Sequence, residues 1–544
     1  MPEIIRKLPQ LIAQWVRPNI SMFMSTRQPQ LWMVALLIGL CVSVAAILFR
    51  ELIGMIQFTW LLDRSENVAT AARRIPWIVI LLVPAGGGLL IGIALTFLEA
   101  KRTGGAADVI EARARGGRNL AFWPGVASAI ITASSLGFGA SAGREGPMIH
   151  LGATISSSIG HAMRIPAWGQ RTLLACGVAS AISASFNTPI AGALFAHEVI
   201  LGHYAMRSFV PIVLSSVAGT ILSRQWFGES AAFIIPDFQI TSYLEFPAFA
   251  LLGIICAFVG VIFQFALIST DYVARNVEIP LWLRPAIGGL MVGAIAVYYP
   301  EVLGVGYEAT DQALHNKLPI LLMISLLIAK TAATSITLAS RFGGGIIAPS
   351  LYLGAMTGGA FGLIAAAAFP ELASSQGIYS LLGMGAVAAS VIGAPISTTV
   401  MMFELTGGYA LTVALLLTVS ISAGLNQAIH GRSFFQWQLE ARGLMVQDGP
   451  HQYLIKNTRV ADFMTLLDDE DDPLAPHDPE DGSVALRATD TLEHALRTFD
   501  QGGHARLPVL DASDNTKIIG WASQVNALSN FNKALIDASE EEHK

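Results

Sequence analysis

The sequence is poor in charged residues and in cysteine. Only 13% of its 544 residues are charged, whereas a typical soluble protein has about 25%. This shortage, together with a hydrophobic share of 53%, excludes an ordinary soluble protein and indicates many membrane spans. The cysteines lie in apolar stretches without metal-ligand spacing, which argues against a disulfide framework or a zinc site. They are Cys41, Cys176 and Cys256.

The signatures of catalysis are missing too. The chain has no metal-ligand cluster, no nucleophile with a nearby base and no phosphate-binding loop, so we do not expect an enzyme. The N-terminus mixes polar and apolar residues and does not resemble a signal peptide. The partners that we expect are a lipid bilayer, small anions and protons, and not a nucleic acid.

Uninterrupted hydrophobic runs are fewer than the composition suggests. About 20 apolar residues are needed to cross the hydrocarbon core. The clearest runs lie near residues 32–49, 77–98, 209–222, 246–269, 318–335, 358–369 and 409–425, and those near 122–137 and 378–394 are broken by Gly, Ser or Ala. Broken helices survive at membrane depth only when they are buried in protein or face a water-filled cavity. We therefore predict many tilted or re-entrant helices.

Basic residues indicate which side of the membrane the loops occupy. They precede the first span and follow the second, at Arg6, Lys7, Arg17, Arg27, Lys101, Arg102, Arg113, Arg115 and Arg118. By the positive-inside rule, both regions are cytoplasmic. We expect a multi-pass protein of a bacterial inner (plasma) membrane, with both termini in the cytoplasm.

A short pattern occurs twice, 202 residues apart. Gly143–Ala153 reads G-R-E-G-P-M-I-H-L-G-A, and Gly345–Ala355 reads G-I-I-A-P-S-L-Y-L-G-A. A second pair follows at an offset of 206: Pro189 with Glu198, and Pro395 with Glu404. Interrupted hydrophobic segments at corresponding places in two halves indicate a transport site near the membrane midplane.

The two copies differ in charge, because Arg144 and Glu145 stand where the second copy has Ile346 and Ile347. An ionisable residue within a membrane segment is a functional candidate by default. The structural alternative is a private ion pair between Arg144 and Glu145, although adjacent residues seldom face each other on a helix.

The motif also predicts an anion site made of main-chain amides. Gly143 and Gly146 let the backbone turn its N–H groups into a cavity, and Pro147 suits the first turn of a helix. Free amides and the positive end of the dipole make a helix N-terminus an anion site. Two such ends would hold a small anion without a full positive charge. Glu145 would compete with the anion for these amides and leave when protonated.

With these motifs, residues 30–440 resemble the CLC family of chloride channels and chloride/proton exchangers. The resemblance implies an all-α polytopic membrane protein with a CLC-type inverted repeat of many tilted and broken helices. It also implies a homodimer with one pore in each subunit. Glu145 would be the external gating glutamate, and the amides of Ile346 and Ile347 would line the central anion site.

Two departures from the family concern the central anion. The family motif G-S-G-I-P corresponds to Gly104–Asp108, so Gly105 stands where the family has a serine hydroxyl. Phe435 stands where the family has a tyrosine. Because hydrogen bonds to a charge contribute roughly 1.5–3 kcal/mol each, we expect weaker anion binding. Phe435 could still act as a steric gate.

A third departure concerns protons. Glu198 matches the first of two adjacent family residues, and Val199 stands where exchangers generally carry a proton-accepting glutamate. Channel members also carry Val there, which favours a pH- or voltage-gated chloride channel. The alternative is a chloride/proton antiporter that uses Glu145 with water or His197, since His titrates near neutral pH. His197 could equally be a packing residue. Glu404 is interpreted as structural. A non-conducting membrane sensor is a remote alternative.

The C-terminal part differs in composition. Residues 451–544 contain 8 Lys and Arg against 18 Asp and Glu. An acidic loop at 467–482 precedes a pattern of helix, strand, strand and helix over residues 492–535 that resembles a CBS motif; residues 460–465 resemble its lead-in. One copy is visible, so a partner copy could come from a second subunit. CBS pairs often bind adenine nucleotides, but a structural or dimer-stabilising tail is favoured over an adenine-nucleotide sensor.

The domain organisation follows from these features. We predict a cytoplasmic N-terminal segment at 1–30 and a transmembrane domain at 31–440. Its two halves span about 31–235 and 245–440. A small α/β CBS-like cytoplasmic domain follows at 455–544.

Overall fold

The computed structural model describes residues 16–21, 24, 27–114, 120–228, 240–406, 409–444, 458–467, 484–511 and 517–543. The chain divides into two compact units. The larger unit comprises Met1–Tyr204 and Ser208–Phe434, and the second comprises Ala205–Arg207 and Phe435–Lys544. The domain boundaries predicted from the sequence stay predictions.

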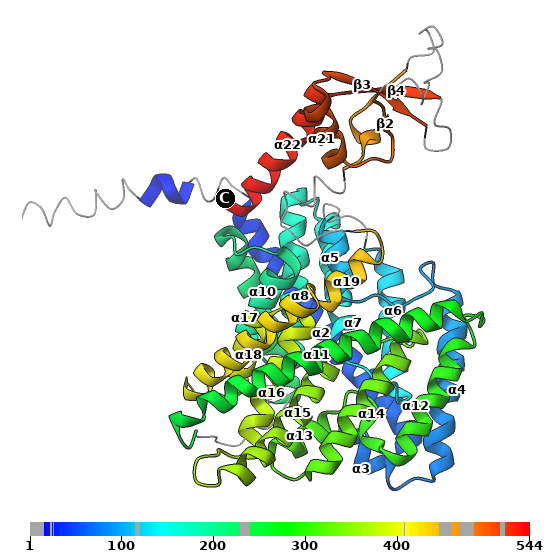
Figure 1. The fold of residues 1–544 in the computed structure, drawn as a ribbon, viewed down its shortest axis with the longest axis vertical. Helices are drawn as coiled ribbons and strands as arrows, with labels where there is room; N and C mark the ends of the chain where they lie inside the picture. Colours follow the sequence, from blue (N-terminus) through cyan, green and yellow to red (C-terminus); the bar gives the residue numbers. More distant parts are fainter. Residues whose placement is uncertain are drawn as a thin grey trace, which may run out of the picture. The chain divides into compact units, whose positions relative to one another are not determined.

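The larger unit is built from helices in two successive sets (Figure 1). The first set is α2 (Gln28–Leu61), α3 (Val68–Ala72), α4 (Trp77–Thr96), α5 (Ala106–Ala114), α6 (Phe122–Gly137), α7 (Glu145–Ala162), α8 (Ala167–Phe186), α9 (Pro189–Phe195), the π-helical η1 (Ala196–Leu201) and α10 (Met206–Phe227). The second set is η2 (Tyr243–Glu245), α11 (Phe246–Asn276), α12 (Arg284–Tyr298), η3 (Pro300–Val302), α13 (Tyr307–Leu314), α14 (Ile320–Ala339), α15 (Ile347–Ala368), α16 (Gln376–Ile392), α17 (Pro395–Thr406) and α18 (Tyr409–Ile429).

Helix lengths agree with the predicted hydrophobic runs. Among the described residues, seven helical segments are long and apolar enough to cross a membrane, and each overlaps one of the seven clear runs. The two broken runs form α6 and α16, with 16 and 17 residues, which are shorter than a full crossing needs. The prediction of short, interrupted helices is therefore confirmed.

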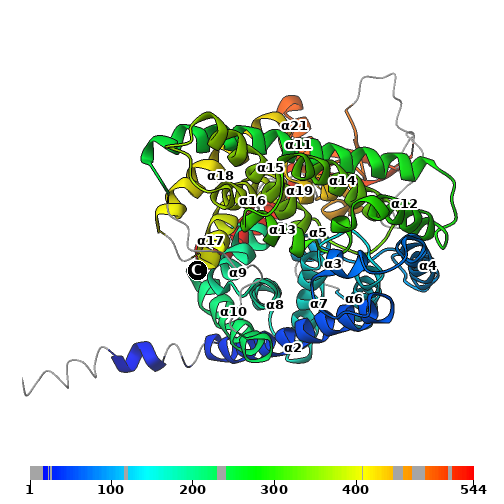
Figure 2. The same cartoon turned by 90° about the horizontal axis from the view of Figure 1, so that it is seen from below.

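The two sets of helices repeat one plan. Figure 2 shows the helices of the first half on one side of the larger unit and those of the second half on the other. α4 contacts α12, and α9 contacts α17. In each half a proline begins the short helix, at Pro189 and Pro395, after a residue with positive φ. These turning residues are Asn187 (φ 64°) and Gly393 (φ 76°), which fits left-handed helix ends.

Glycines set the close packing at equivalent places in the two halves. A Cβ atom on Gly152 of α7 would lie 2.4 Å from the carbonyl oxygen of Gly177 on α8. A Cβ atom on Gly354 of α15 would lie 2.2 Å from the carbonyl oxygen of Gly383 on α16. Only glycine permits these approaches, as is usual where membrane helices pack backbone to backbone.

Two glutamates cap helices of the opposite half. Glu404, on α17, accepts hydrogen bonds from the N–H groups of Ile190 (2.8 Å) and Ala191 (2.7 Å) at the start of α9. Glu198, on η1, accepts hydrogen bonds from the N–H groups of Ile396 (3.0 Å) and Ser397 (2.7 Å) at the start of α17. Each half therefore satisfies helix-start amides that the other half cannot satisfy alone.

The second unit contains a small α/β domain. Its elements are α19 (Phe434–Glu440), η4 (Val460–Asp462), β1 (Thr465–Leu466), β2 (Leu486–Arg487), α21 (Leu492–Gly502), β3 (Arg506–Leu510), β4 (Ile518–Ser523) and α22 (Gln524–His543). The sheet order is β1-β4-β3-β2, with β2 parallel to β3 and the other pairs antiparallel. The predicted order of helix, strand, strand and helix is confirmed, and the fold is consistent with a CBS-like tail. The acidic loop lies outside the described residues, apart from Leu467.

Candidate functional site

The two copies of the repeated motif meet through their backbones. The N–H group of Gly143 donates to the carbonyl oxygen of Gly345, and the N–H group of Gly345 donates to that of Gly143, both at 2.7 Å. α7 begins at Glu145 and α15 at Ile347, two residues after each glycine. The N-termini of the two helices therefore meet at one junction, as the repeat predicts.

Main-chain amides are available at this junction. The amides in the first turn of a helix have no partner within the helix. Pro147 and Pro349 have no N–H group. The next residues, Met148 and Ser350, already donate to the carbonyl oxygens four residues before them. The amides that remain lie at Glu145 and Gly146 of α7 and at Ile347 and Ala348 of α15. Ile346 and Ile347 are both buried, and their predicted role at the anion site stays a prediction.

Glu145 occupies the junction itself. Its side chain is fully buried. Oε1 accepts a hydrogen bond of 2.8 Å from the hydroxyl of Tyr307. A Cβ atom added to Gly143 would lie 2.6 Å from Oε2 of Glu145 and 3.2 Å from the amide nitrogen of Ala348. Oε2 and this amide therefore lie on the same side of Gly143. Among the described residues Oε2 has no hydrogen-bond partner. The carboxyl group thus lies where α7 and α15 direct their amides.

Arg144 pairs with a different acid. Its Nη1 atom lies 2.7 Å from Oε1 of Glu66, and Nη2 of Arg50 lies 3.1 Å from the same oxygen. Within the described part of the chain, no ion pair joins Arg144 to Glu145, so the alternative of a private pair between them is wrong. Burial alone would raise the pKa of Glu66, but Arg144 and Arg50 outweigh it and hold that pKa below its usual range. Glu66 is therefore ionised at neutral pH.

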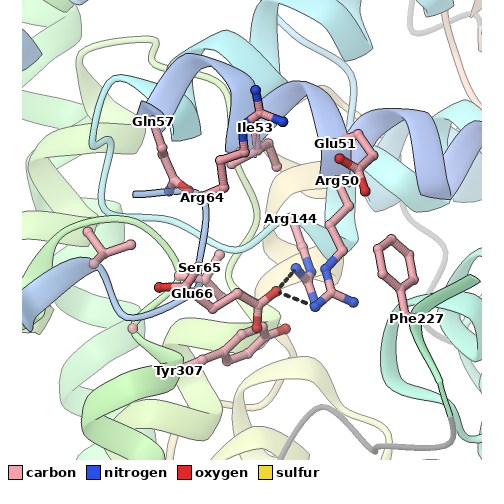
Figure 3. Close-up of a pocket in the computed structure, with 14 residues that line it drawn as sticks. Arg50, Glu51, Ile53, Gln57, Arg64, Ser65, Glu66, Arg144, Phe227 and Tyr307 are labelled. Carbon is pink, nitrogen blue, oxygen red and sulfur yellow. Dashed lines mark hydrogen bonds and ion pairs between the residues drawn. The ribbon is translucent and has the colours of Figure 1, made fainter. Parts of the chain in front are cut away.

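A pocket lies beside Tyr307, the residue that donates to Glu145 (Figure 3). Its volume is about 270 Å³, and Tyr307 and Arg144 line it. Figure 3 shows Glu66 facing the neighbouring guanidinium groups of Arg50 and Arg144, with the Tyr307 ring next to them. Tyr307 therefore forms part of the pocket wall and also donates to Glu145. It is the polar link between the pocket and the buried carboxyl group.

The segment that carries Tyr307 is held by a buried lysine. Nζ of Lys330 donates to the carbonyl oxygens of Val302 (3.0 Å) and Gly304 (2.9 Å). Gly306 then takes a positive φ of 91° as the residue before α13, a conformation that favours glycine. Lys330 is fully buried, so its amine is hydrogen-bonded to main-chain oxygens and not to water, and these bonds hold the segment that leads to α13.

Gly105 lies at the start of α5. Its N–H group donates to Oδ2 of Asp108 at 2.8 Å, and Asp108 is paired with Arg102. A Cβ atom on Gly105 would have no heavy atom within 4 Å, so space is open beside it. In Figure 1, α5 lies near one end of the larger unit, and α3 and α13 lie near the opposite end. The structure thus does not bring Gly105 next to the pocket.

The residues of the predicted proton pathway are in η1. Glu198 uses its carboxylate to cap α17, as described above. His197 is buried; its Nδ1 atom lies 3.0 Å from the carbonyl oxygen of His203, and its ring is stacked with Tyr204 at 5.6 Å. Among the described residues, its Nε2 atom has no hydrogen-bond partner. Val199 is half-buried. A role for these residues in proton transfer stays a prediction.

Phe435 is the remaining residue that the sequence places at the anion site. It belongs to α19 and to the second unit, and its role as a gate stays a prediction. Sequence reasoning missed Tyr307, Glu66 and Arg50. One signal for Tyr307 was present, because it stands 202 residues after Gly105, the offset of the repeat. Gly105 in the first half has no hydroxyl group, whereas Tyr307, at the equivalent place in the second half, has one.

Comparisons with known proteins agree on one family. A family model described as voltage gated chloride channel matches residues 86–427. The chain is 34% identical over 389 residues to a putative chloride channel protein ClcB-like of Ralstonia nicotianae, covering 71% of this chain and 90% of that protein. It is 30% identical over 432 residues to the H(+)/Cl(-) exchange transporter ClcA of Cronobacter sakazakii, covering 77% of this chain and 91% of that protein.

A solved structure supports the same fold. The crystal structure of a slow cyanobacterial Cl−/H+ antiporter superposes with a TM-score of 0.69 at 23% sequence identity, covering 76% of this chain and 98% of that chain. At this identity the likeness shows the fold alone.

Proposed function

The chain belongs to the voltage-gated chloride channel (CLC) family, and on that premise we propose that it exchanges chloride for protons. Transport of anions across a membrane follows from the family, and the helices described above make it an integral, multi-pass membrane protein. The coupling to protons is our proposal. It rests on the buried carboxyl group at the junction of α7 and α15.

The position of Glu145 is the observation that carries the proposal. A negatively charged carboxylate and a chloride ion would both be stabilised by the same helix-start amides. The carboxylate must therefore leave the junction whenever an anion occupies it. A protonated carboxyl group gives up its charge and competes less well for these amides. Binding of a proton to Glu145 thus favours binding of an anion at the junction, which links the two ions.

Two regions at opposite ends of the larger unit give the anion access to this junction in our proposal. The pocket beside Tyr307 would be the outer approach, since Arg144 and Arg50 attract anions to it. The open space beside Gly105 would be the inner approach. This assignment agrees with the cytoplasmic location that the positive-inside rule gives to the loop before α5.

One relative leads us to prefer exchange over the channel expected from Val199. The ClcA relative of Cronobacter sakazakii is named for exchange of chloride and protons. His197, with an unpartnered Nε2 among the described residues, is a candidate for the inner proton acceptor. Because Glu198 caps α17, we assign it a structural role.

Simultaneous flux measurements test the proposal. In proteoliposomes with a chloride gradient and no proton gradient, we expect chloride movement to drive protons in the opposite direction at a fixed ratio. A membrane potential set with valinomycin and potassium should change both fluxes together. Protein-free liposomes give the background. Chloride flux without any proton movement above that background would contradict exchange.

A channel is the second candidate, and Val199 is the observation that favours it. A valine cannot accept a proton, and channel members of the family resemble this chain at that position. The relative of Ralstonia nicotianae is also named as a putative chloride channel. In the flux assay, a channel would move chloride at a rate independent of the proton signal.

Replacing Tyr307 by Phe is expected to loosen the gate. The hydroxyl donates to Glu145 at 2.8 Å and stabilises the charged carboxylate, so its removal favours the protonated, released form. A hydrogen bond to a charged group contributes roughly 1.5–3 kcal/mol, and about 1.4 kcal/mol corresponds to one pH unit. The pH at which chloride flux is half-maximal should therefore rise by about one to two units. The same variant in a Glu145→Gln background should have no such effect. An unchanged pH profile of the single variant would show that the hydrogen bond from Tyr307 does not hold Glu145 in its charged form.

The setting of the protein in the cell is also proposed. We expect a homodimer in a bacterial inner membrane, with both termini in the cytoplasm. The second unit would then act as a structural or dimer-stabilising tail. Binding of an adenine nucleotide to it remains the alternative.

A further inference from the structure

Three arginines line the pocket beside the gate, and each is stacked on an aromatic ring. The pairs are Arg50 on Phe227, Arg64 on Phe58 and Arg144 on Tyr307, with 4.0, 4.9 and 4.9 Å between guanidinium carbon and ring centroid. A ring against the flat face of a guanidinium restricts its motion and leaves the N–H groups at its edge free to donate. The donors around this pocket are therefore held in place before any ligand arrives.

The positive charge in the pocket exceeds the negative charge. The lining residues include three arginines and two glutamates, Glu51 and Glu66. A single oxygen of Glu66 serves both Arg50 (3.1 Å) and Arg144 (2.7 Å). Each guanidinium carries five N–H donors, so one shared carboxylate oxygen uses few of them. Arg64 also lines the pocket and is exposed, and in Figure 3 its guanidinium group lies apart from those of Arg50 and Arg144.

The size of the pocket points to a ligand larger than a halide. Its volume of about 270 Å³ is near the lower end of the range for small-molecule sites, about 300 Å³. A single-atom anion can contact few of the donors at once, whereas an oxyanion accepts paired N–H groups from a guanidinium edge. We propose that this pocket binds a polyatomic oxyanion of the phosphate or sulfate class, which limits anion access to Glu145.

The consequence for transport follows from Tyr307. This residue belongs to the pocket wall and donates to Glu145, so an oxyanion in the pocket lies between the solvent and the gate. It adds negative charge beside the carboxyl group and occupies the approach that a chloride ion would use. This site goes beyond the proposed exchange, because a channel with the same pocket would be inhibited in the same way.

Direct binding tests the site without any transport. Inorganic pyrophosphate is titrated into the purified full-length protein in detergent and followed by calorimetry. Saturable binding is expected, and Arg64→Gln should weaken it about tenfold or more. Arg74→Gln is the matched control: Arg74 is an exposed arginine ten residues further along, outside the pocket, and its loss should change the affinity less than about twofold. Arg64→Lys keeps the charge but loses the paired N–H donors of the guanidinium edge, so its affinity for pyrophosphate should be intermediate.

Two sources could supply this chemistry, and a second arm separates them. Short-chain phosphatidylglycerol replaces pyrophosphate in the same titration; binding of the lipid alone, sensitive to Arg64→Gln, would assign the site to a lipid headgroup. In proteoliposomes of neutral lipid, external pyrophosphate should slow chloride flux of the wild type more than that of Arg64→Gln. The proposal is overturned if neither ligand binds, or if the Arg64 and Arg74 variants weaken binding equally. Loss of chloride flux in the untreated protein would instead refute the proposed function.

Discussion

Replacing Glu145 by Gln should abolish proton movement and leave chloride flux that hardly depends on pH. The amide keeps the shape of a protonated carboxyl group but cannot ionise, so the side chain no longer competes with the anion as a charge. Tyr307 also loses a charged acceptor, which weakens the contact that holds the side chain in the junction. Proton uptake driven by a chloride gradient should fall to the level of protein-free liposomes.

The measurement compares chloride flux over a range of external pH. The wild type should show at least a several-fold change, and Glu145→Gln less than about a twofold change. Glu308→Gln is a suitable control, because Glu308 is a carboxylate on α13, next to Tyr307 in the sequence, that accepts from the N–H group of Thr70 at 3.0 Å. It should keep the wild-type profile. A pH profile that survives in Glu145→Gln would exclude Glu145 as the gate.

Replacing Glu404 by Ala is expected to destabilise the larger unit strongly. Two amides at the start of α9 lose their acceptor, at Ile190 and Ala191. Each hydrogen bond to a charged group contributes roughly 1.5–3 kcal/mol, and one of the two lies at an exposed residue. The free energy of unfolding should therefore fall by about 2–4 kcal/mol.

Thermal stability in detergent, followed by size-exclusion chromatography after heating, measures this loss. Glu404→Gln keeps one acceptor oxygen and should lose less. Glu198→Gln, at the equivalent cap of α17, should behave like Glu404→Gln and leave the ratio of chloride to protons unchanged. A changed ratio in Glu198→Gln would mean that Glu198 carries protons in addition to its structural role. Full stability of Glu404→Ala would refute the capping argument.

The repeat in the sequence predicts much of the fold. The offset of 202 residues is enough to expect that α7 and α15 begin at equivalent points, and Gly143 and Gly345 are hydrogen-bonded to each other. The helix-start prolines and the small residues between neighbouring helices are local signals of the same kind. These patterns can be read in the sequence because a main-chain junction depends on glycine and proline at fixed positions and tolerates few other residues there.

The side-chain partners of Arg144 and Glu145 were harder to predict. Arg144 is adjacent to Glu145 in the motif, yet its partner is Glu66, which precedes it by 78 residues. Tyr307 lies 162 residues beyond Glu145. No periodicity links such positions, because contacts between distant segments depend on how the helices pack. The sequence motif identifies the charged residue, and the tertiary fold decides what it contacts.

Glu404 and Glu198 each cap a helix of the opposite half, and this arrangement has a consequence for biosynthesis. A ribosome adds about 5–20 residues per second, and Glu404 follows Ile190 by 214 residues. The start of α9 must therefore wait roughly 10–40 seconds for its acceptor while the nascent chain is being inserted. During that interval, lipid headgroups, water or an insertase must satisfy those amides. A truncated product that stops before Glu404 would be a natural target for membrane quality-control proteases.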